Sequence, residues 1–154
     1  MRYGAPMTTI RRARADDADA IATLYLASFR ATYDFPLVHD DAAVRSWTSH
    51  HVVGGLETWV ALEGEETVGF MALSPALLEQ LYISSGWTGQ GIGTRLVELA
   101  KTRRPQGLEL WTFQVNEAAR RFYRRLGFVE VEYGDGSQNE EGRPDVRLAW
   151  RTAT

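Results

Sequence analysis

A glycine-rich segment over residues 86–93 has the residue types and spacing of a ligand-binding loop. It follows the short apolar run 81–83 and leads into an amphipathic pattern in which Ile92, Leu96 and Leu99 share one face. Glycine lets the backbone take positive φ and approach a ligand without a Cβ in the way. The first N–H groups of a helix have no partner inside it, so they face a ligand together with the positive end of the helix dipole. The segment therefore predicts a cradle for a phosphate or pyrophosphate.

A second segment, residues 116–128, combines a polar start with an apolar stripe. Asn116 is a favourable N-cap, and Gly127 suits the position after a helix end. Ala119, Phe122 and Tyr123 fall on one face of this predicted helix, while four arginines cover the other. By residue type alone, Asn116 is a helix cap and Tyr123 is a half-buried core tyrosine.

Together the two segments resemble the GNAT N-acetyltransferases. Residues 88–93, Thr-Gly-Gln-Gly-Ile-Gly, resemble the acetyl-CoA pyrophosphate loop of that family, whose pattern is Arg/Gln-x-x-Gly-x-Gly/Ala. Residues 116–128 resemble its second signature, Asn-x-x-Ala-x-x-x-Tyr-x-x-x-Gly-Phe, at the right separation. The loop departs from the pattern at Thr88, where the family has Arg or Gln. It also lacks the Gly-Lys-Ser/Thr of a P-loop and the third glycine of a Rossmann fingerprint.

The resemblance implies that acetyl-CoA is the cosubstrate. Backbone groups of Leu81, Tyr82 and Ile83 would then pair with the amides of the pantetheine arm. The residues implied at the pyrophosphate are Thr88, Gly89, Gln90, Gly91, Ile92, Gly93 and Thr94. Asn116 would bond the cofactor near its acyl end, a role compatible with capping.

Tyr123 matches the general acid of the family. Attack of an amine on the thioester expels a thiolate with a pKa of about 8.5 by analogy with cysteine. A tyrosine with a pKa near ~10 is protonated at neutral pH and can donate a proton to that sulfur. The resemblance thus assigns Tyr123 a catalytic role rather than a purely structural one.

Glu79 is the candidate base, because a primary amine with a pKa near ~10 must lose a proton before it attacks. Strand alternation predicts that Glu79 shares a face with Leu81 and Ile83, and that Gln80 lies on the other face. It would act directly or through a water. Two other roles stay open for Glu79, a cross-strand charge pair and an anchor for the substrate ammonium.

The acceptor pocket of the family lies among the first two helices, the central strands and the late hairpin loop. The aromatic residues that this places at its walls are Phe29, Tyr33, Trp47 and Trp111, with Asp34 beside them. The acceptor is expected to be a small-molecule or peptide amine. The three histidines lack the carboxylate or cysteine spacing of a metal site, so no metal is expected.

Two alternatives to the enzyme stay open. A non-catalytic acyl-CoA sensor or assembly module would keep the site, and Thr88 is the feature that favours it. A nucleotide phosphate-binding enzyme would use the same glycine loop with ATP. A homodimer is expected only by resemblance, because dimers are common among GNAT proteins.

Composition fits one domain able to hold these elements. The chain has 154 residues, 44% of them hydrophobic and 24% charged. A formal net charge of −3 gives no basic field for nucleic acid. The sequence contains no cysteine, no signal-peptide pattern and no apolar run long enough for a membrane span, so a cytoplasmic location is expected. Residues 1–8 are predicted to be a flexible start, and residues 9–154 a single N-acetyltransferase domain.

The remaining elements follow from periodicity and from turn residues. Helices are expected from Asp16 to about residue 32, over 42–51, from Ile92 to before Pro105, and over 117–126. Strands are expected over residues 9–13, 58–62, 67–73, 77–83, 108–113, 128–131 and 146–150. The predicted fold class is α/β, a single-domain GNAT-like fold with one mostly antiparallel mixed sheet of about six or seven strands flanked by about four helices.

Overall fold

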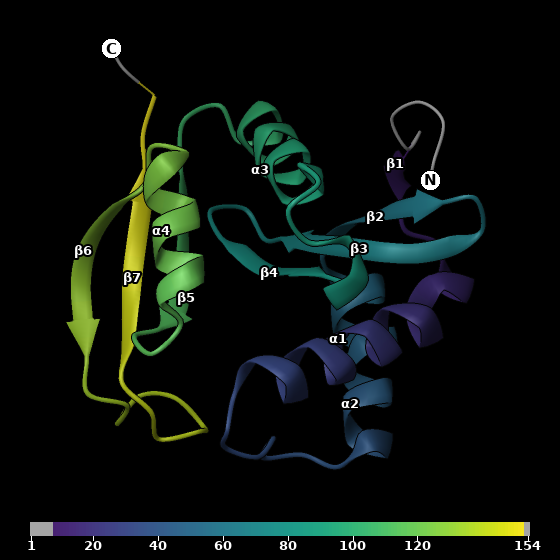
Figure 1. Ribbon diagram of the computed structural model, residues 1–154, viewed down its shortest axis with the longest axis horizontal. Helices are drawn as coiled ribbons and strands as arrows, with labels where there is room; N and C mark the ends of the chain where they lie inside the picture. The colour runs from purple at the N-terminus through teal and green to yellow at the C-terminus, as the bar shows by residue number, and fades with distance from the viewer. Residues whose placement is uncertain (1–7, 153–154) are drawn as a thin grey trace.

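Seven strands and four α-helices form the protein in a computed structural model that describes residues 8–152 (Figure 1). The helices are α1 (Ala18–Thr32), α2 (Asp41–Trp47), α3 (Ile92–Arg103) and α4 (Glu117–Arg125). The strands are β1 (Thr9–Arg12), β2 (Glu57–Glu63), β3 (Glu66–Leu73), β4 (Leu78–Ile83), β5 (Leu108–Phe113), β6 (Val129–Gly134) and β7 (Asp145–Trp150). Short helical turns occur at η1 (Ala15–Asp17), η2 (Thr48–Val53) and η3 (Ser85–Trp87).

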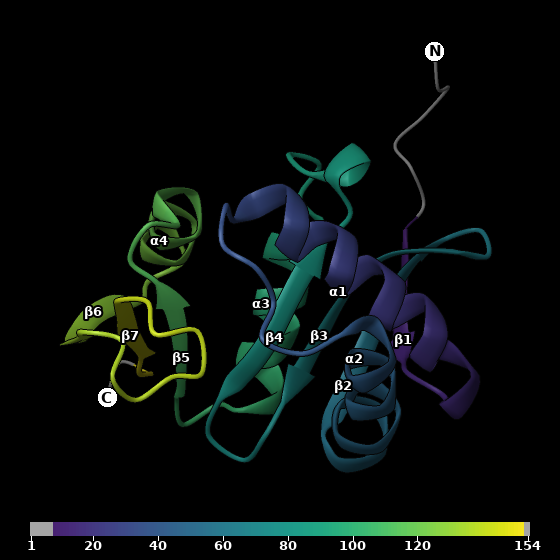
Figure 2. The ribbon, with the colours of Figure 1, turned by 90° about the horizontal axis from the view of Figure 1, so that it is seen from below.

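The strands form two antiparallel sheets, in the orders β1-β2-β3-β4 and β5-β7-β6. The sheets meet at a single isolated parallel bridge between Leu77 and Glu109. The α/β class of the prediction is confirmed, but the expected continuous sheet is divided, because β4 and β5 diverge after this bridge. Figure 2 shows the result, with β5, β6, β7 and α4 forming a group beside the first sheet. The divergence opens the space in which the site lies.

Apolar clusters cover both faces of the first sheet. Helix α3 lies on one face, and α1 with α2 on the other (Figure 1). Met71 and Leu73 of β3 pack on the α3 side, whereas Phe70 and Ala72 pack beneath α1. Because both faces of β3 are buried, its sequence is an almost continuous apolar run instead of an alternating one. This central strand holds the neighbouring β4 in a fixed place.

Two local features differ from the sequence-based expectation. The helix expected over residues 42–51 becomes π-helical from Thr48, whose buried hydroxyl donates a hydrogen bond to the Val44 carbonyl at 2.8 Å. In β4, Leu78 pairs with Leu73 and Gln80 pairs with Ala72. Glu79 between them has no partner on β3 and is the extra residue of a β-bulge. The bulge breaks the alternation that was expected to place Glu79 on the face of Leu81.

Most of the predicted start, residues 1–7, lies outside the described part of the chain. Thr8 is buried, and its carbonyl accepts a hydrogen bond from Arg95 at 2.9 Å. Within residues 8–152, none of the helices combines the length and the apolar content that crossing a bilayer requires.

Candidate active site

A cavity of about 640 Å³ lies between the end of α1, β4, the glycine-rich loop, the start of α3 and one face of α4. It brings together nearly all the residues that were predicted to bind the cofactor: Leu81, Tyr82, Ile83, Thr88, Gly89, Gly91, Ile92, Gly93, Thr94 and Asn116. Tyr123 lines it as well. Gln90 is exposed and does not contribute to the lining.

The glycine loop presents the start of α3 to this cavity. Gly89 and Gly91 have φ of 76° and 82°, a left-handed conformation that other residues adopt at a cost. Gly91 is the N-cap residue, and no side chain caps the helix, so the first N–H groups of α3 are left for another acceptor. Gly93 is required for a different reason, lack of space, because a Cβ there would lie 3.1 Å from the Phe122 ring of α4.

Thr88 turns back into the loop. Its hydroxyl donates to the carbonyl of Ser85 at 3.2 Å. A threonine here therefore contributes to loop closure, and it carries no charge toward a phosphate.

Asn116 uses both ends of its side-chain amide within the protein. Its Oδ1 accepts from the Ala119 N–H at 3.1 Å, which is the predicted cap, and its Nδ2 donates to the Tyr33 hydroxyl at 2.9 Å. Tyr33 follows α1 and also lines the cavity, where burial raises its pKa while hydrogen bonds with Asn116 and Thr112 oppose that rise. The Tyr33–Asn116 bond joins α1 to the start of α4 across the opening between the sheets.

The Tyr123 ring is held firmly while its hydroxyl is free. The residue is 8% exposed, and its ring packs against Phe122 and Phe128. None of the described residues forms a hydrogen bond with the hydroxyl, which is also not sealed from the cavity. Burial raises the pKa of Tyr123 well above its usual value near 10. The side chain therefore stays neutral and can donate its proton.

Glu79 and Trp111 lie together in a small separate hollow with Leu110. Glu79 Oε1 is 3.8 Å from Nε2 of His51. Neither Glu79 nor Trp111 contributes to the lining of the cavity that contains Tyr123. Phe29, another predicted wall, is only 2% exposed and packs against the Tyr33 and Phe35 rings.

A second cavity, of about 600 Å³, lies beside the first. Its polar and aromatic lining includes Tyr25, His39, Trp47, Gln80, Glu140 and Glu141. The Tyr25 ring stands edge-on to Tyr82 at 5.1 Å, and Tyr82 lines the first cavity, so the two cavities share a wall. Burial, followed by the charges of Glu141 and Glu140, raises the pKa of Tyr25 to about 12. The charge of Glu141 also acts on Tyr33 and Tyr82, so this carboxylate influences both cavities.

Of the predicted acceptor residues, only Trp47 lines this second cavity. Sequence reasoning missed Tyr25, Glu140 and Glu141, and it placed Gln80 on the less useful face. The two adjacent glutamates in a polar hairpin loop are a weak signal, because such residues are usually solvated. Their place beside the second cavity follows from the position of the loop, which no local pattern encodes. His39 Nε2 lies 3.1 Å from Glu140 Oε2 and brings the loop before α2 next to the late hairpin.

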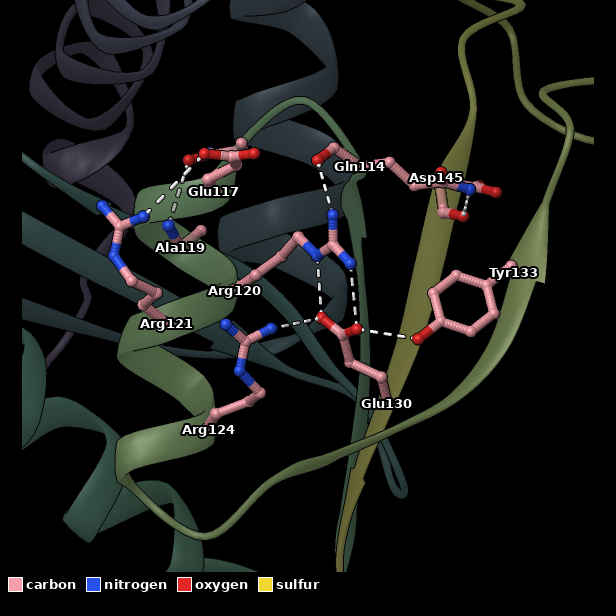
Figure 3. A network of polar contacts seen from close by, with 10 residues as sticks. Gln114, Glu117, Ala119, Arg120, Arg121, Arg124, Glu130, Tyr133 and Asp145 are labelled. Carbon is pink, nitrogen blue, oxygen red and sulfur yellow. Dashed lines mark hydrogen bonds and ion pairs between the residues drawn. The ribbon is translucent and has the colours of Figure 1, made fainter.

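Glu130 of β6 anchors α4 (Figure 3). Its carboxylate accepts two hydrogen bonds from Arg120, at 2.7 and 2.9 Å, and one from Arg124 at 2.9 Å. The Tyr133 hydroxyl donates a further bond at 2.9 Å. The Arg120 bonds, above all, lower the pKa of Glu130 to about 2. This network fixes the helix that carries Asn116 and Tyr123. Among residues 8–152, no three His, Cys, Asp or Glu side chains gather in a way that could hold a metal ion.

The cavity is bordered by the edge strand β4, by the uncapped start of α3 and by the buried Tyr123. These features suit a phosphate-bearing cofactor. Comparison with known proteins agrees, because the sequence profile of the family described as "Acetyltransferase (GNAT) domain" matches residues 54–130. The peptidyl-lysine N-acetyltransferase YjaB of Salmonella typhimurium is 34% identical over 139 residues, covering 90% of this chain and 93% of that protein. The chain therefore belongs to the GNAT family of acetyltransferases, which confirms the predicted family and the acyltransferase class.

Solved structures share the fold. The solution structure of apo YjaB from Escherichia coli has a TM-score of 0.78 at 27% identity, over 96% of this chain and 99% of that one. The PaiA N-acetyltransferase of Thermoplasma acidophilum, solved in complex with coenzyme A, has a TM-score of 0.72 at 16% identity, over 94% of this chain and 98% of that one. At that identity the second similarity concerns the fold alone.

Proposed function

We propose that this protein is an acetyl-CoA-dependent N-acetyltransferase whose acceptor is a primary amine, in the first place the side chain of a lysine in a peptide. The observation that carries the proposal is that Tyr123 and the open N–H groups of α3 line the same cavity. The name of the YjaB relative supports the choice of a peptide lysine.

The residues of the cavity suit acetyl-CoA, which supplies a thioester-activated acetyl group. The N–H groups around Gly91 and Gly93 would bind the pyrophosphate, where the positive end of α3 favours negative charge. The edge of β4 that faces the opening between the sheets would pair with the pantetheine amides. Asn116 caps the start of α4, the helix that carries Tyr123.

Tyr123 would donate its proton to the sulfur that leaves. Its hydroxyl has no competing partner among the described residues, and its raised pKa keeps the proton in place until negative charge develops on the sulfur. The proton that the amine loses must go to a carboxylate or to solvent.

For the acceptor, the second cavity provides aromatic walls and a negative potential. Glu141 is the carboxylate whose charge reaches the tyrosines on both sides of the shared wall, so it suits a substrate ammonium. Glu79 stays the predicted base, acting through a water, although it lines neither cavity. A Glu79→Gln variant compared with Glu141→Gln distinguishes these two roles, because losing an anchor raises KM whereas losing a base lowers kcat.

A second candidate function is a non-catalytic acyl-CoA sensor. Thr88 favours it, because its short side chain bonds within the loop and offers no charge to the cofactor. A homodimer and a cytoplasmic location stay predictions, to be checked by sedimentation and by cell fractionation.

The deciding experiment joins binding to turnover. Acetyl-CoA at 100 times its dissociation constant should stabilise the fold by about 2.7 kcal/mol, and ATP should not. Release of free coenzyme A is then measured with lysine peptides and with small amines. In Tyr123→Phe, kcat should fall by about 10²-fold or more while the acetyl-CoA melting shift stays the same.

Tyr133→Phe is the control, because it removes one tyrosine hydroxyl from β6, outside both cavities. The hydroxyl bonds Glu130, but the three arginine bonds that hold this carboxylate against α4 remain in the variant. Acetyl-CoA binding without turnover on any amine would identify the sensor. Stabilisation by ATP alone would identify a nucleotide enzyme and reject the acetyltransferase.

A further inference from the structure

Three of the four arginines on α4 are paired with carboxylates. Arg120 and Arg124 bind Glu130, at 2.7 and 2.9 Å, and Arg121 lies 3.9 Å from Glu117 (Figure 3). Arg125 forms no hydrogen bond or ion pair with any residue in the described part of the chain. Its guanidinium is exposed and free to bind an anion from outside the protein.

Arg125 also lines the cofactor cavity, and it is the one charged residue among the lining residues that the structure describes. The other three arginines of α4 surround a different, shallow hollow on the outer face of the helix. The positive side chain of the cavity therefore comes from α4 and not from the glycine loop, where the family pattern has Arg or Gln and this chain has Thr88.

The order of residues along α4 places Arg125 relative to the cradle. Asn116 is at the start of the helix, and Phe122 lies against Gly93 of the cradle. Arg125 is three residues beyond Phe122, on the same face and one turn further from Asn116. At 1.5 Å per residue, Arg125 is ~13 Å along the helix from Asn116. It therefore lies beyond the pyrophosphate cradle, on the side away from the acyl end.

We propose that Arg125 binds the 3′-phosphate of the acyl-CoA and supplies the cationic contact that the loop lacks at Thr88. The proposal rests on the proposed function, because it assigns a residue to a cofactor that is itself proposed. Coenzyme A carries its anionic charge at the pyrophosphate and at the 3′-phosphate. The N–H groups of α3 would bind the pyrophosphate. The 3′-phosphate lies further from the acyl end, on the side where Arg125 lies. A guanidinium binds a phosphate monoester through two parallel N–H···O bonds.

The test compares coenzyme A with dephospho-coenzyme A, which differs only in lacking the 3′-phosphate. Dissociation constants are measured by calorimetry for wild type, Arg125→Ala, Arg125→Lys and Arg121→Ala. Wild type should bind coenzyme A about five- to tenfold more tightly than dephospho-coenzyme A. Arg125→Ala should lose that preference by weakening coenzyme A binding alone, and Arg125→Lys should keep part of it. Arg121→Ala removes an equal charge from the same helix and should keep the full preference.

Salt gives a second readout. The preference for coenzyme A should shrink as ionic strength rises in wild type, because exposed charge pairs are screened. It should not change with salt in Arg125→Ala. Equal weakening of both ligands by Arg125→Ala would place Arg125 at the pyrophosphate and overturn the proposal. Equal binding of both ligands by wild type would also overturn it, whereas failure of wild type to bind either ligand would reject the proposed function itself.

Discussion

At the residue scale, environment decides what Tyr123 and Asn116 can do. A tyrosine on an apolar helix stripe is usually a core residue, and the Tyr123 ring does pack in the core. Its hydroxyl, however, faces a cavity without a bonded partner among the described residues, which leaves a proton available. Asn116, by contrast, already uses its amide for the cap and for Tyr33.

The protonation states predict the pH dependence of turnover. With a lysine acceptor, kcat/KM should rise with pH through 9. The reason is that the fraction of unprotonated amine increases as the pH approaches the lysine pKa of about 10.4. Tyr123 should not cause a decline below pH ~10, because burial raises its pKa and its neutral form is the donor. Initial rates at a subsaturating acceptor concentration from pH 6 to 10 check this. A descending limb centred below pH 9 would contradict a neutral tyrosine as the acid.

The positions of the site residues were therefore predictable where a motif carried them, and not elsewhere. Both signature segments line one cavity, as their order in the sequence indicated. The Tyr33 bond to Asn116 spans 83 positions, and no local pattern links those two residues. Glu141 is equally hidden, because its effect on Tyr25 and Tyr82 depends on where its loop lies.

At the element scale, the start of α3 depends on backbone conformation. Gly91→Ala should destabilise the fold by about 1 kcal/mol, because φ of 82° is unfavourable for alanine even though the space is open. It should also weaken acetyl-CoA binding severalfold by turning the first N–H groups of α3 away from the cavity. Urea unfolding and calorimetry measure the two effects.

Gly64→Ala provides the control, because Gly64 has φ of 60°, open space around it and a position in the β2–β3 turn. It should cost similar stability and leave acetyl-CoA binding unchanged. If both variants lose affinity equally, the effect of Gly91 is general loss of stability and not cradle geometry.

Element boundaries were mostly predictable, and the irregularities inside elements were not. The range of β5 agrees with its prediction, and α1 ends at Thr32, shortly before Pro36, as expected. The bulge at Glu79 and the π-helical turn after Trp47 arise from pairing with β3 and from packing of η2 against the sheet. Such tertiary causes leave no periodic signal in the sequence.

At the scale of the whole molecule, ion pairs join α3 to the first sheet. Glu57 of β2 accepts hydrogen bonds from Arg103 at 2.6 Å and from Arg104 at 3.1 Å. Burial opposes the ionisation of Glu57, but the bonds from Arg103, Trp59 and Arg104 outweigh it and lower the pKa to about 2.

Acid should therefore weaken the fold in a defined window. A carboxylate with a lowered pKa stabilises the folded state above its unfolded pKa of about 4.5, and that contribution disappears as pH falls through 2. The free energy of unfolding should decrease steadily from pH 4.5 to pH 2. Glu57→Gln should be less stable at pH 7 and should show a shallower decrease, as measured by urea unfolding at each pH. Glu65→Gln, in the exposed β2–β3 turn, should follow wild type, and an unchanged slope in Glu57→Gln would contradict the assignment.

The divided sheet is the architectural feature that sequence reasoning did not predict. Strand patterns indicate that strands exist and which residues face the core, but not where neighbouring strands diverge. Here a single bridge between Leu77 and Glu109 joins two sheets that otherwise diverge. Both signature segments border the resulting opening.

That opening has a consequence for the lifetime of the protein. With acyl-CoA bound as proposed, the ligand would contact both sheets, whose strands pair with each other only at the bridge between Leu77 and Glu109 in the described part of the chain. Its contacts would add to those that hold the two sheets together. A ligand that binds only the folded state divides the ratio of unfolded to folded protein by one plus the ligand concentration over its dissociation constant. The protein should therefore survive longest against cellular proteases when acetyl-CoA is abundant, so its quantity as well as its rate would follow the supply of its own cosubstrate.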